Sequence, residues 1–557
     1  MTKYVFTTGG VLSSVGKGAV TSSVGKILQV RGFTVTVIKI DPYLNYDSGT
    51  MNPYMHGEVF VTENGGETDL DLGSYERFLN IDIEKINNIT TGQVYWQVID
   101  RERRGDFLGA CVQIIPHISD EIKRRIRLVA ERSKVDVVLV ECGGTVGDIE
   151  ALPFYEAFRQ MKADEGESNT MVVHVALVPW LEATGEYKTK PLQHSVQELR
   201  RVGLPPDVIM ARSRDVLPDG PLRKISLFGS VPLRNVFCSV DVESIYELPI
   251  ILDKQGLGEV VCDRLRLPHT LARWDNWEQI VDTLKNPKHE VKIAMCGKYA
   301  ELSDSYISIN EALKHAGGAA GTRVLIDWIE AEVFEGKDNC KEQLAEHDGV
   351  LVPGGFGSRG AEGKIAAIRF ARECGVPFLG ICYGFQLATV EFARGVVGLE
   401  GANSTEIDEK SPHPVIDLLP EQRGVTRKGG TMRLGAYPIS VKRDSLAWRL
   451  YGHEVIYERH RHRYEVNPEY WEKLTGAGLV FSGSTMDGSR IEILELPDHF
   501  FFFATQFHPE FKSRPGRPDP AYYGFVKACL EKKLGKSKPE IPVLGVDYPA
   551  AFTTLGS

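Results

Sequence analysis

The stretch "VPFLGICYGFQLATVEFAR", residues 376–394, decides the fold of the C-terminal half of this chain. Its first six residues form an apolar run that predicts a buried strand, and the residues from Tyr383 onward have the pattern of a helix. Cys382 would then lie in a sharp strand-to-helix turn, with its side chain exposed at the end of a sheet. Because a helix N-terminus stabilises thiolate, the reactive form of cysteine, the stretch predicts a nucleophile in an α/β domain.

A proton carrier for this nucleophile is offered by "ATQFHPEF", residues 504–511. In an extended chain, His508 and Glu510 point to the same side, and Pro509 disfavours helix at the residue before it. Glu510 can then orient the imidazole of His508. The sequence therefore predicts a triad of Cys382, His508 and Glu510.

An oxyanion site is predicted in "LVPGGFG", residues 351–357. The backbone N–H groups of Gly354 and Gly355, together with the amide of Tyr383, could bind a developing negative charge. A lone cysteine or a lone "HPE" is usually structural. The glycine-flanked cysteine, the earlier "PGG" loop and the later "HPE" are together far more specific.

The N-terminal half opens with a different signal, "TTGGVLSSVGKGAVTSSVGKILQVRG", residues 7–32. Backbone amides of a glycine-rich turn between strand and helix bind phosphate, and Lys17 adds charge. Five residues rather than four separate Gly10 from Gly16, and Gly18 replaces the hydroxyl residue that normally holds magnesium. The alternative is that these glycines merely form a tight turn.

Any magnesium ion near this loop needs carboxylates from elsewhere, and Asp71 and Glu141 are the candidates. In "GEYKTKPLQHS", residues 185–195, Lys188 and Lys190 could grip a second polyphosphate. "GGTVGDIE", residues 143–150, follows Glu141 directly. Each of these two segments, taken alone, is more often a surface loop or a turn.

The composition is that of a globular protein, with 42% apolar and 25% charged residues among 557. With 65 basic and 75 acidic residues the formal net charge is −10, which argues against a nucleic-acid or anionic-membrane binder. No signal peptide or 18-residue apolar span is found, so we expect a cytoplasmic protein. Nine cysteines without CxxC spacing indicate neither a disulfide framework nor a zinc site.

The quoted motifs resemble those of CTP synthases, and the resemblance covers residues 1–530. The N-terminal half carries "GGVLSSVGKG", "IKIDPYLN", "HGEVFVT", "ETDLDLGSYERF", "CGGTVGDIE", "TGEYKTKP" and "KISLF". The C-terminal half carries "VPGGFGSRG", "LGICYGFQ", "ANSTE", "GGTMRLG", "ERHRHRYEVN" and "QFHPE". The resemblance implies an α/β fold with a P-loop-like parallel-sheet synthetase (amidoligase) domain, followed by a class I glutamine amidotransferase α/β domain.

Alternating strand and helix patterns place these domains along the chain. We expect a synthetase domain over residues 1–267, a polar linker over 268–290, an amidotransferase domain over 291–535 and a tail over 536–557.

The resemblance implies that ATP phosphorylates O4 of UTP and that ammonia from glutamine displaces this phosphate, giving CTP. It further implies Mg²⁺, GTP as an activator, CTP as a product inhibitor, and homotetramers that can form filaments, with no nucleic-acid or membrane partner. Lys17 and Lys39 would be catalytic beside the triad, because a fixed cation stabilises a transferring phosphoryl group.

The resemblance also assigns binding residues at matching positions. For ATP they are Ser14, Val15, Gly16, Lys17, Gly18, Ala19, Asp71, Asp241 and Val242, with Asp71 and Glu141 for the metal. For UTP and CTP they are Ser13, Asp148, Ile149, Glu150, Lys188, Thr189, Lys190, Pro191, Leu192, Gln193 and Lys224. For glutamine they are Gly354, Gly355, Tyr383, Gly384, Phe385, Gln386, Glu406 and Arg463, and for GTP Arg359.

Four positions depart from the family pattern, one of them Trp180, which is bulkier than expected in the segment before "YKTK". Tyr383 and Phe385 replace Leu and Met in the elbow, which could alter the pocket wall, and Leu192 replaces a Thr, which would remove one hydroxyl from the triphosphate grip. Two other readings stay open. One is a glutamine-dependent ligase that amidates a carboxylate, of the cobyrinic-acid or dethiobiotin-synthetase type, and the other is a scaffold or filament subunit.

Overall fold

A computed structural model describes residues 2–298, 303–336, 339–425 and 429–540. The chain folds as two compact units. The N-terminal unit is built from Met1–Ser48 and Asp71–Val281, and the C-terminal unit from Gly49–Leu70 and Asp282–Ser557. The sequence-derived domain boundaries remain a prediction, and most of the expected tail lies outside the described residues.

Within the described residues, the N-terminal unit holds a seven-stranded sheet in the order β11-β10-β7-β1-β6-β2-β5. Every strand pairing in this sheet is parallel, as the alternating pattern predicts. The strands are β1 Lys3–Gly10, β2 Val35–Asp41, β5 Asn88–Thr90, β6 Val137–Cys142, β7 Thr170–Leu177, β10 Val208–Ser213 and β11 Val236–Val240.

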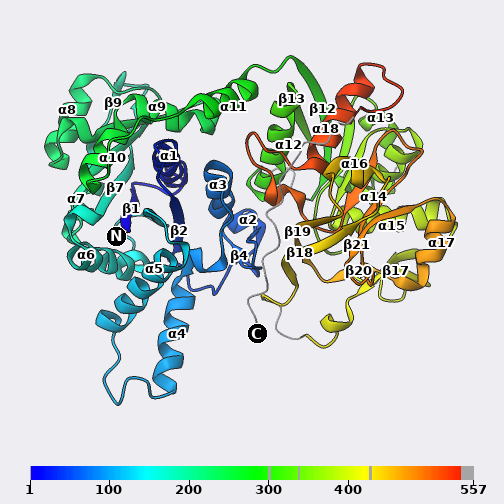
Figure 1. Cartoon of the computed structure of the whole chain (residues 1–557), viewed down its shortest axis with the longest axis horizontal. Helices are drawn as coiled ribbons and strands as arrows, with labels where there is room; N and C mark the ends of the chain where they lie inside the picture. The colour runs from blue at the N-terminus through cyan, green and yellow to red at the C-terminus, as the bar shows by residue number, and fades with distance from the viewer. Residues whose placement is uncertain (1, 299–302, 337–338, 426–428, 541–557) are drawn as a thin grey trace. The chain divides into compact units, whose positions relative to one another are not determined.

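Helices cover both faces of this sheet (Figure 1). Tyr4 and Phe6 of β1 share a buried cluster with helices α4 to α6, whereas Gly25 of α1 lies on the opposite face against Leu139. The strands are apolar on both faces for this reason. The helices are α1 Lys17–Val30, α3 Leu70–Leu79, α4 Thr91–Arg103, α5 Ser119–Ser133, α6 Leu152–Glu165, α7 Lys190–Arg201, α8 Asp219–Gly229, α9 Leu248–Lys254, α10 Leu257–Leu265 and α11 Asp275–Lys285.

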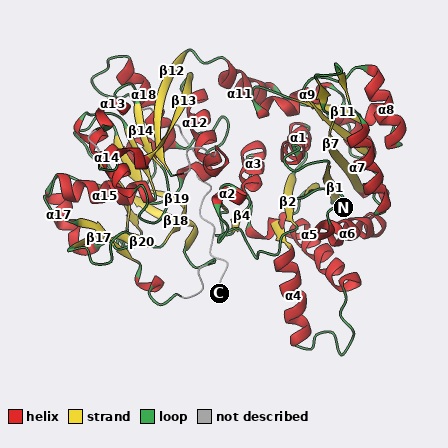
Figure 2. Cartoon of the chain, turned by 180° about the vertical axis from the view of Figure 1, so that it is seen from behind, coloured by secondary structure: helices red, strands yellow, loops and turns green. Residues whose placement is uncertain are grey.

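The described part of the C-terminal unit holds a nine-stranded sheet in the order β13-β12-β14-β15-β23-β22-β21-β18-β19. Figure 2 shows strands β12, β13, β14, β18 and β19 of this sheet, labelled and in yellow. Strands β13 to β23 of this order are parallel, and the remainder pair antiparallel. The strands are β12 His289–Gly297, β13 Thr322–Glu330, β14 Gly349–Val352, β15 Phe378–Ile381, β18 Arg433–Val441, β19 Val455–His462, β21 Val480–Thr485, β22 Ile491–Glu495 and β23 Phe502–Thr505.

Helices and short strands complete this unit. The helices are α2 Pro53–His56, α12 Ile307–Ala319, α13 Cys340–Leu344, α14 Ala361–Glu373, α15 Tyr383–Gly395, α16 Leu446–Tyr451, α17 Trp471–Gly476 and α18 Pro520–Lys533. The short strands are β3 Phe60–Val61, β4 Glu67–Thr68, β16 Ala402–Ser404, β17 His413–Leu418 and β20 Tyr464–Val466.

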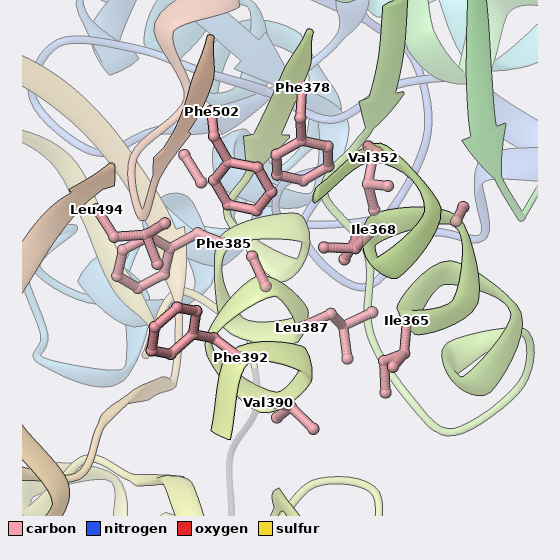
Figure 3. Packing of buried hydrophobic residues seen from close by; sticks show 14 of the residues in the cluster. Val352, Ile365, Ile368, Phe378, Phe385, Leu387, Val390, Phe392, Leu494 and Phe502 are labelled. Carbon is pink, nitrogen blue, oxygen red and sulfur yellow. The ribbon is translucent and has the colours of Figure 1, made fainter. Parts of the chain in front are cut away.

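The core beneath the elbow explains one departure from the family pattern. Phe385 is fully buried and packs with Phe378, Leu494 and Phe502 of the neighbouring strands (Figure 3). Its side chain fills the hydrophobic core rather than a pocket wall, which corrects the expectation from the sequence. Phe385 therefore bears on the site through its backbone and through the packing of α15.

No helix in the part of the chain that the structure describes combines the length and the apolarity needed to cross a membrane.

Candidate active sites

Cys382 lies where β15 ends and α15 begins, as the sequence predicts. Its backbone has φ 51° and ψ −96°, a conformation that residues other than glycine rarely adopt. The backbone N–H of Cys382 donates to the carbonyl of Thr505 at 2.6 Å, which ties the elbow to β23. This strained turn places the thiol at the carboxyl edge of the sheet, but Cys382 is buried, so the expected exposure of its side chain is wrong.

His508 is held by Glu510, because its Nδ1 lies 2.7 Å from Glu510 Oε1. The predicted contact is present, but the expected extended geometry is wrong for Glu510, which lies in the 3-10 helix Pro509–Lys512. Burial lowers the pKa of His508, yet the charges of Glu510 and Cys382 outweigh it and raise this pKa to about 10. Nε2 of His508 makes no hydrogen bond within the described residues and can take the thiol proton.

The glycine loop lies against this pair. A Cβ atom on Gly354 would be 2.9 Å from Cε1 of His508 and 3.8 Å from Cβ of Cys382, so the loop has no room for a side chain there. A Cβ atom on Gly355 would be 3.6 Å from the ring of Tyr383. The Tyr383 hydroxyl donates to the carbonyl of Gly357 at 2.6 Å. The structure thus brings the predicted oxyanion donors to the nucleophile.

Other predicted glutamine residues surround the same loop. Glu406 Oε1 accepts the N–H of Gly357 at 2.8 Å, and burial raises the pKa of Glu406. Arg463 donates to the hydroxyl of Thr431 at 3.1 Å and also to Gln422. Arg359 pairs with Glu332 at 2.9 Å and is half exposed.

Gly384 and Gln386, which the sequence predicts for this site, and Gln506, which it does not, also belong to it. Gly384 has no room for a side chain, because its Cβ would meet the carbonyl of Val352 at 2.2 Å. Gln386 donates to the carbonyl of Tyr464 at 3.0 Å. Sequence reasoning missed Gln506, whose Nε2 lies 3.7 Å from the sulfur of Cys382. Its position two residues before His508 was an available signal.

In the N-terminal unit, the phosphate-loop candidate ends at Gly16, whose φ of 93° favours glycine. No side chain caps the N-terminus of α1 in the described chain, so its amides can bind an anion. Lys17 extends over Gly9 and donates to the carbonyl of Gly144 at 2.5 Å. Burial lowers the pKa of Lys17, although the charge of Glu141 opposes this shift.

Lys39 joins the two predicted metal ligands. Its ammonium pairs with Asp71 and lies 3.2 Å from Glu141 Oε1. The hydroxyl of Tyr75, which the sequence analysis did not single out, donates to Glu141. Tyr75 follows Asp71 by four residues, so helical spacing places both on one face of α3.

The two carboxylates fit a magnesium ion, as the surroundings of Gly18 show. A Cβ atom on Gly18 would lie 3.0 Å from Asp71 Oδ1 and 3.7 Å from Glu141 Oε2. The carboxylates converge where a P-loop Ser or Thr side chain would stand, which explains the glycine. Magnesium in phosphate sites is commonly held by one or two carboxylates together with phosphate oxygens. Within the described residues, no group of three or more His, Cys, Asp and Glu side chains is arranged so that it could hold a metal ion.

The predicted triphosphate grip lies around the start of α7. Lys188 pairs with Glu186, and the Lys190 ammonium lies 5.4 Å from the ring centre of Phe228. Gln193 donates to the hydroxyl of Thr189 at 2.9 Å. Leu192, however, is fully buried among core residues of α7, β7 and β10, so its side chain has no part in a phosphate site. The expected loss of a hydroxyl from the grip is corrected accordingly.

The remaining residues predicted for the nucleotides, Asp241 for ATP and residues 148–150 for UTP and CTP, have different surroundings. Asp241 pairs with Arg212 at 2.6 Å, and Arg212 also lies against Gly16. Asp148 accepts the N–H of Thr145 at 2.7 Å within its own turn. Ile149 and Glu150 line an apolar pocket of about 800 Å³ with side chains of α4, α6 and the 42–44 turn. The described lining of this pocket includes none of residues 13–19, 188–193 or 224.

Comparisons with known proteins agree with this arrangement. A family profile described as "CTP synthase N-terminus" matches residues 3–267, and "Glutamine amidotransferase class-I" matches residues 301–528. These matches define the class: a synthetase domain fused to a class I glutamine amidotransferase domain.

Relatives match over nearly the whole chain. A CTP synthase of Thermococcus gammatolerans is 58% identical over 96% of this chain and 100% of its own length. One of Pyrococcus furiosus is 57% identical over 96% of this chain and 99% of its own length. The solved structure of a Trypanosoma brucei CTPS glutaminase domain with bound acivicin is 39% identical, with a TM-score of 0.41, and covers 43% of this chain and 94% of that one. On the identity of its full-length relatives, the chain belongs to the CTP synthase family, whose members are glutamine-hydrolysing ligases.

Proposed function

We propose that this protein makes CTP from UTP, with ATP as the activating co-substrate and glutamine as the nitrogen source. The observation that carries the proposal is the presence, in one chain, of a Cys382–His508–Glu510 arrangement and a Lys39–Asp71–Glu141 cluster. Nearly full-length similarity to CTP synthases supports it.

In the glutaminase site, the Cys382 thiolate attacks the side-chain carbonyl carbon of glutamine. The oxyanion that forms accepts hydrogen bonds from backbone N–H groups of the Gly354 loop and of Tyr383. The His508 imidazolium then gives its proton to the leaving ammonia, and neutral His508 next takes a proton from the water that hydrolyses the thioester. Glu510 keeps the imidazole oriented and its positive form favoured.

Glutamine itself is held by groups of matching charge. We assign its α-amino group to Glu406, whose carboxylate lies beside the glycine loop, and its α-carboxylate to Arg463. The backbone of residues 354–355 and 383–386 forms the remaining wall. Arg359 is assigned to the activator GTP, because its half-exposed guanidinium can reach an anionic or guanine-bearing ligand.

In the synthetase site, the amides of residues 14–19 and the Lys17 ammonium bind the ATP phosphates. Lys39 stabilises the charge on the γ-phosphoryl group of ATP as it passes to O4 of UTP, and ADP is the leaving group. A Mg²⁺ ion held by Asp71 and Glu141 would neutralise further phosphate charge. Ammonia then displaces phosphate from C4 of the 4-phosphorylated UTP, and CTP and inorganic phosphate leave.

UTP is assigned to Ser13, Lys224 and the start of α7. CTP is assigned to the same triphosphate grip together with residues 148–150, so it inhibits its own formation. Large apolar side chains that line the 149–150 pocket and are exposed, such as Leu44, Ile114 and Ile149, support the expected homotetramer, in which another copy would cover them.

Chromatographic detection of CTP tests the proposal. UTP, ATP and magnesium are supplied with glutamine plus GTP in one reaction and with ammonium chloride in the other. We expect CTP from both nitrogen sources. If neither yields CTP, the proposed function is wrong, and a ligase that amidates a carboxylate becomes the better interpretation.

A further inference from the structure

Residues 49–70 precede Asp71 in the N-terminal half of the sequence but pack within the C-terminal unit. In this 49–70 segment, helix α2 leads to the antiparallel pair β3 and β4. Figure 1 shows the segment, in blue, beside β18 and β19. The glutaminase unit therefore contains a piece of chain that the sequence motifs assign to the synthetase half.

The turn of the β3–β4 hairpin lies directly on β18. The N–H of Ala436 donates to the carbonyl of Glu63 at 2.9 Å. Gly65 and Gly435 face each other with φ of 81° and 92°, and a Cβ atom on Gly435 would lie 2.6 Å from the nitrogen of Gly65. Two glycines in the left-handed region permit this close approach.

Two ion pairs join the hairpin to β19. Arg459 Nε donates to Glu63 at 2.8 Å, and Arg461 Nε donates to Glu67 at 2.9 Å. The side chains of Arg459 and Glu67 are completely buried. Removing one partner of a buried pair leaves an uncompensated charge, so each pair fixes the position of the strand that carries it.

The backbone of the same two arginines touches the catalytic groups. The carbonyl of Arg459 accepts the N–H of His508 at 2.8 Å. The carbonyl of Arg461 lies 3.7 Å from the sulfur of Cys382. β19 therefore carries hairpin contacts on its side chains and triad contacts on its carbonyls.

A second route runs through aromatic rings. Phe60 of β3 packs its edge against Phe511 at 5.1 Å between ring centres, and Phe511 stacks on His508 at 5.2 Å. Lys512, in the same turn as Phe511, also pairs with Glu63 at 3.4 Å. The hairpin thus contacts supports of both the nucleophile and the base.

We propose that the 49–70 segment positions the glutaminase triad, with Glu63 and Glu67 as the positioning residues. They act through β19, whose carbonyls orient Cys382 and His508, and neither touches glutamine. The inference rests on the proposed glutaminase role of this site. It follows that hydrolysis of glutamine depends on two carboxylates supplied from the N-terminal half of the sequence.

Full-length Glu63→Gln and Glu67→Gln variants test this, since each keeps the side-chain volume and removes the charge. We expect the kcat of glutamine hydrolysis, measured with GTP, to fall about 10- to 100-fold while KM changes by less than about 2-fold, because small misplacement of reacting groups costs that much. Ammonia-dependent CTP formation should change by less than about 2-fold. Glu67→Asp, which keeps the charge, should recover part of the lost kcat.

Glu391→Gln is the matched control. Glu391 of α15 forms a buried pair with Arg372 of α14 at 2.8 Å in the same unit. Its loss should lower the melting temperature and leave kcat near that of the wild type. If the hairpin variants have wild-type kcat, or if they lose glutamine hydrolysis and ammonia-dependent CTP formation together and in proportion to their loss of melting temperature, the positioning role is wrong.

Alkylation of Cys382 by iodoacetamide tests the positioning role separately from the proposed function. Its rate is measured by mass spectrometry of the peptide that contains Cys382. We expect slower alkylation in both hairpin variants. If the wild type is alkylated quickly but hydrolyses no glutamine, the proposed function is wrong, while the positioning of Cys382 by the 49–70 segment still holds. Unchanged alkylation in the variants would overturn the positioning itself.

Discussion

The loops around Cys382 and His508 are packed so closely that an added Cβ on Gly354 or Gly384 would clash with its neighbours. The elbow around Cys382 and the pairing of His508 with Glu510 could be predicted from residue types and spacing alone. The support from Gln506 and from the Arg461 carbonyl could not, because it comes from backbone that is distant in sequence. The burial of Leu192 and Phe385 was also invisible, since one apolar residue in a helix does not reveal which way it faces.

Glu510→Gln should change the pH dependence of glutamine hydrolysis. The Glu510 charge helps to raise the pKa of His508 from 6.5 to about 10, so its removal lowers that pKa. His508 must be protonated to release ammonia, and the alkaline limb of kcat should therefore move to lower pH by about one unit or more. A pH profile from 6 to 11 measures this. An unmoved alkaline limb would mean that Glu510 does not control the charge of His508.

The same shift affects stability. Because the folded-state pKa of His508 is higher than its unfolded value of about 6.5, the stabilisation is fully present below pH 6.5. It is lost as the pH rises through about 10. Thermal melts of the wild type and Glu510→Gln across this window should converge at the alkaline end, and a constant difference would contradict the linkage.

Gly354→Ala should disable the glutaminase selectively. The added methyl would lie 2.9 Å from Cε1 of His508, so either the ring or the loop must shift. We expect kcat for glutamine hydrolysis to fall about 100-fold, with ammonia-dependent synthesis unchanged. Gly476→Ala, at a position where an added Cβ would meet nothing within 4 Å, is the control. Equal kcat values for the two variants would mean that Gly354 is not part of the glutaminase site.

At the scale of elements, the proposed synthetase site lies where β2, β6 and the first turn of α3 meet. Lys39 and Glu141 are direct partners in the register of β2 and β6. Parallel βαβ units were predictable from the alternating pattern, and in such a sheet the carboxyl ends of the strands form the ligand edge. The order of the strands, which sets Lys39 beside Glu141, was not predictable from local pattern.

Lys39→Met should remove the cation shared by Asp71 and Glu141. The unfolding free energy should fall by about 3–5 kcal/mol, the usual cost of leaving one side of a buried pair. CTP formation from either nitrogen source should be lost, with glutamine hydrolysis retained. Magnesium should raise the melting temperature of the variant more than that of the wild type, because it replaces the lost charge. Equal magnesium effects would contradict a metal site at these carboxylates.

At the scale of the whole molecule, the sequence indicates two α/β domains with one boundary between them. In the structure each compact unit is built from two separate stretches of the chain. α11 lies across the segment predicted as a linker, and the 49–70 segment packs with the glutaminase unit although its motifs adjoin synthetase motifs. Contacts between positions about 400 residues apart, such as Glu63 with Arg459, leave no local signal in a single sequence. The two expected activities could be predicted from motifs. The packing of the 49–70 segment within the C-terminal unit could not.

If two separate sites in one chain share a reaction, Cys382→Ala should disable one site and leave the other intact. CTP formation from UTP and ATP is measured with glutamine plus GTP and, in parallel, with ammonium chloride. We expect the glutamine-dependent rate to be abolished, because no thiolate remains to form the thioester, and the ammonia-dependent rate to stay within about 2-fold of the wild type. Loss of both rates in a variant that melts like the wild type, or survival of the glutamine-dependent rate, would contradict the account.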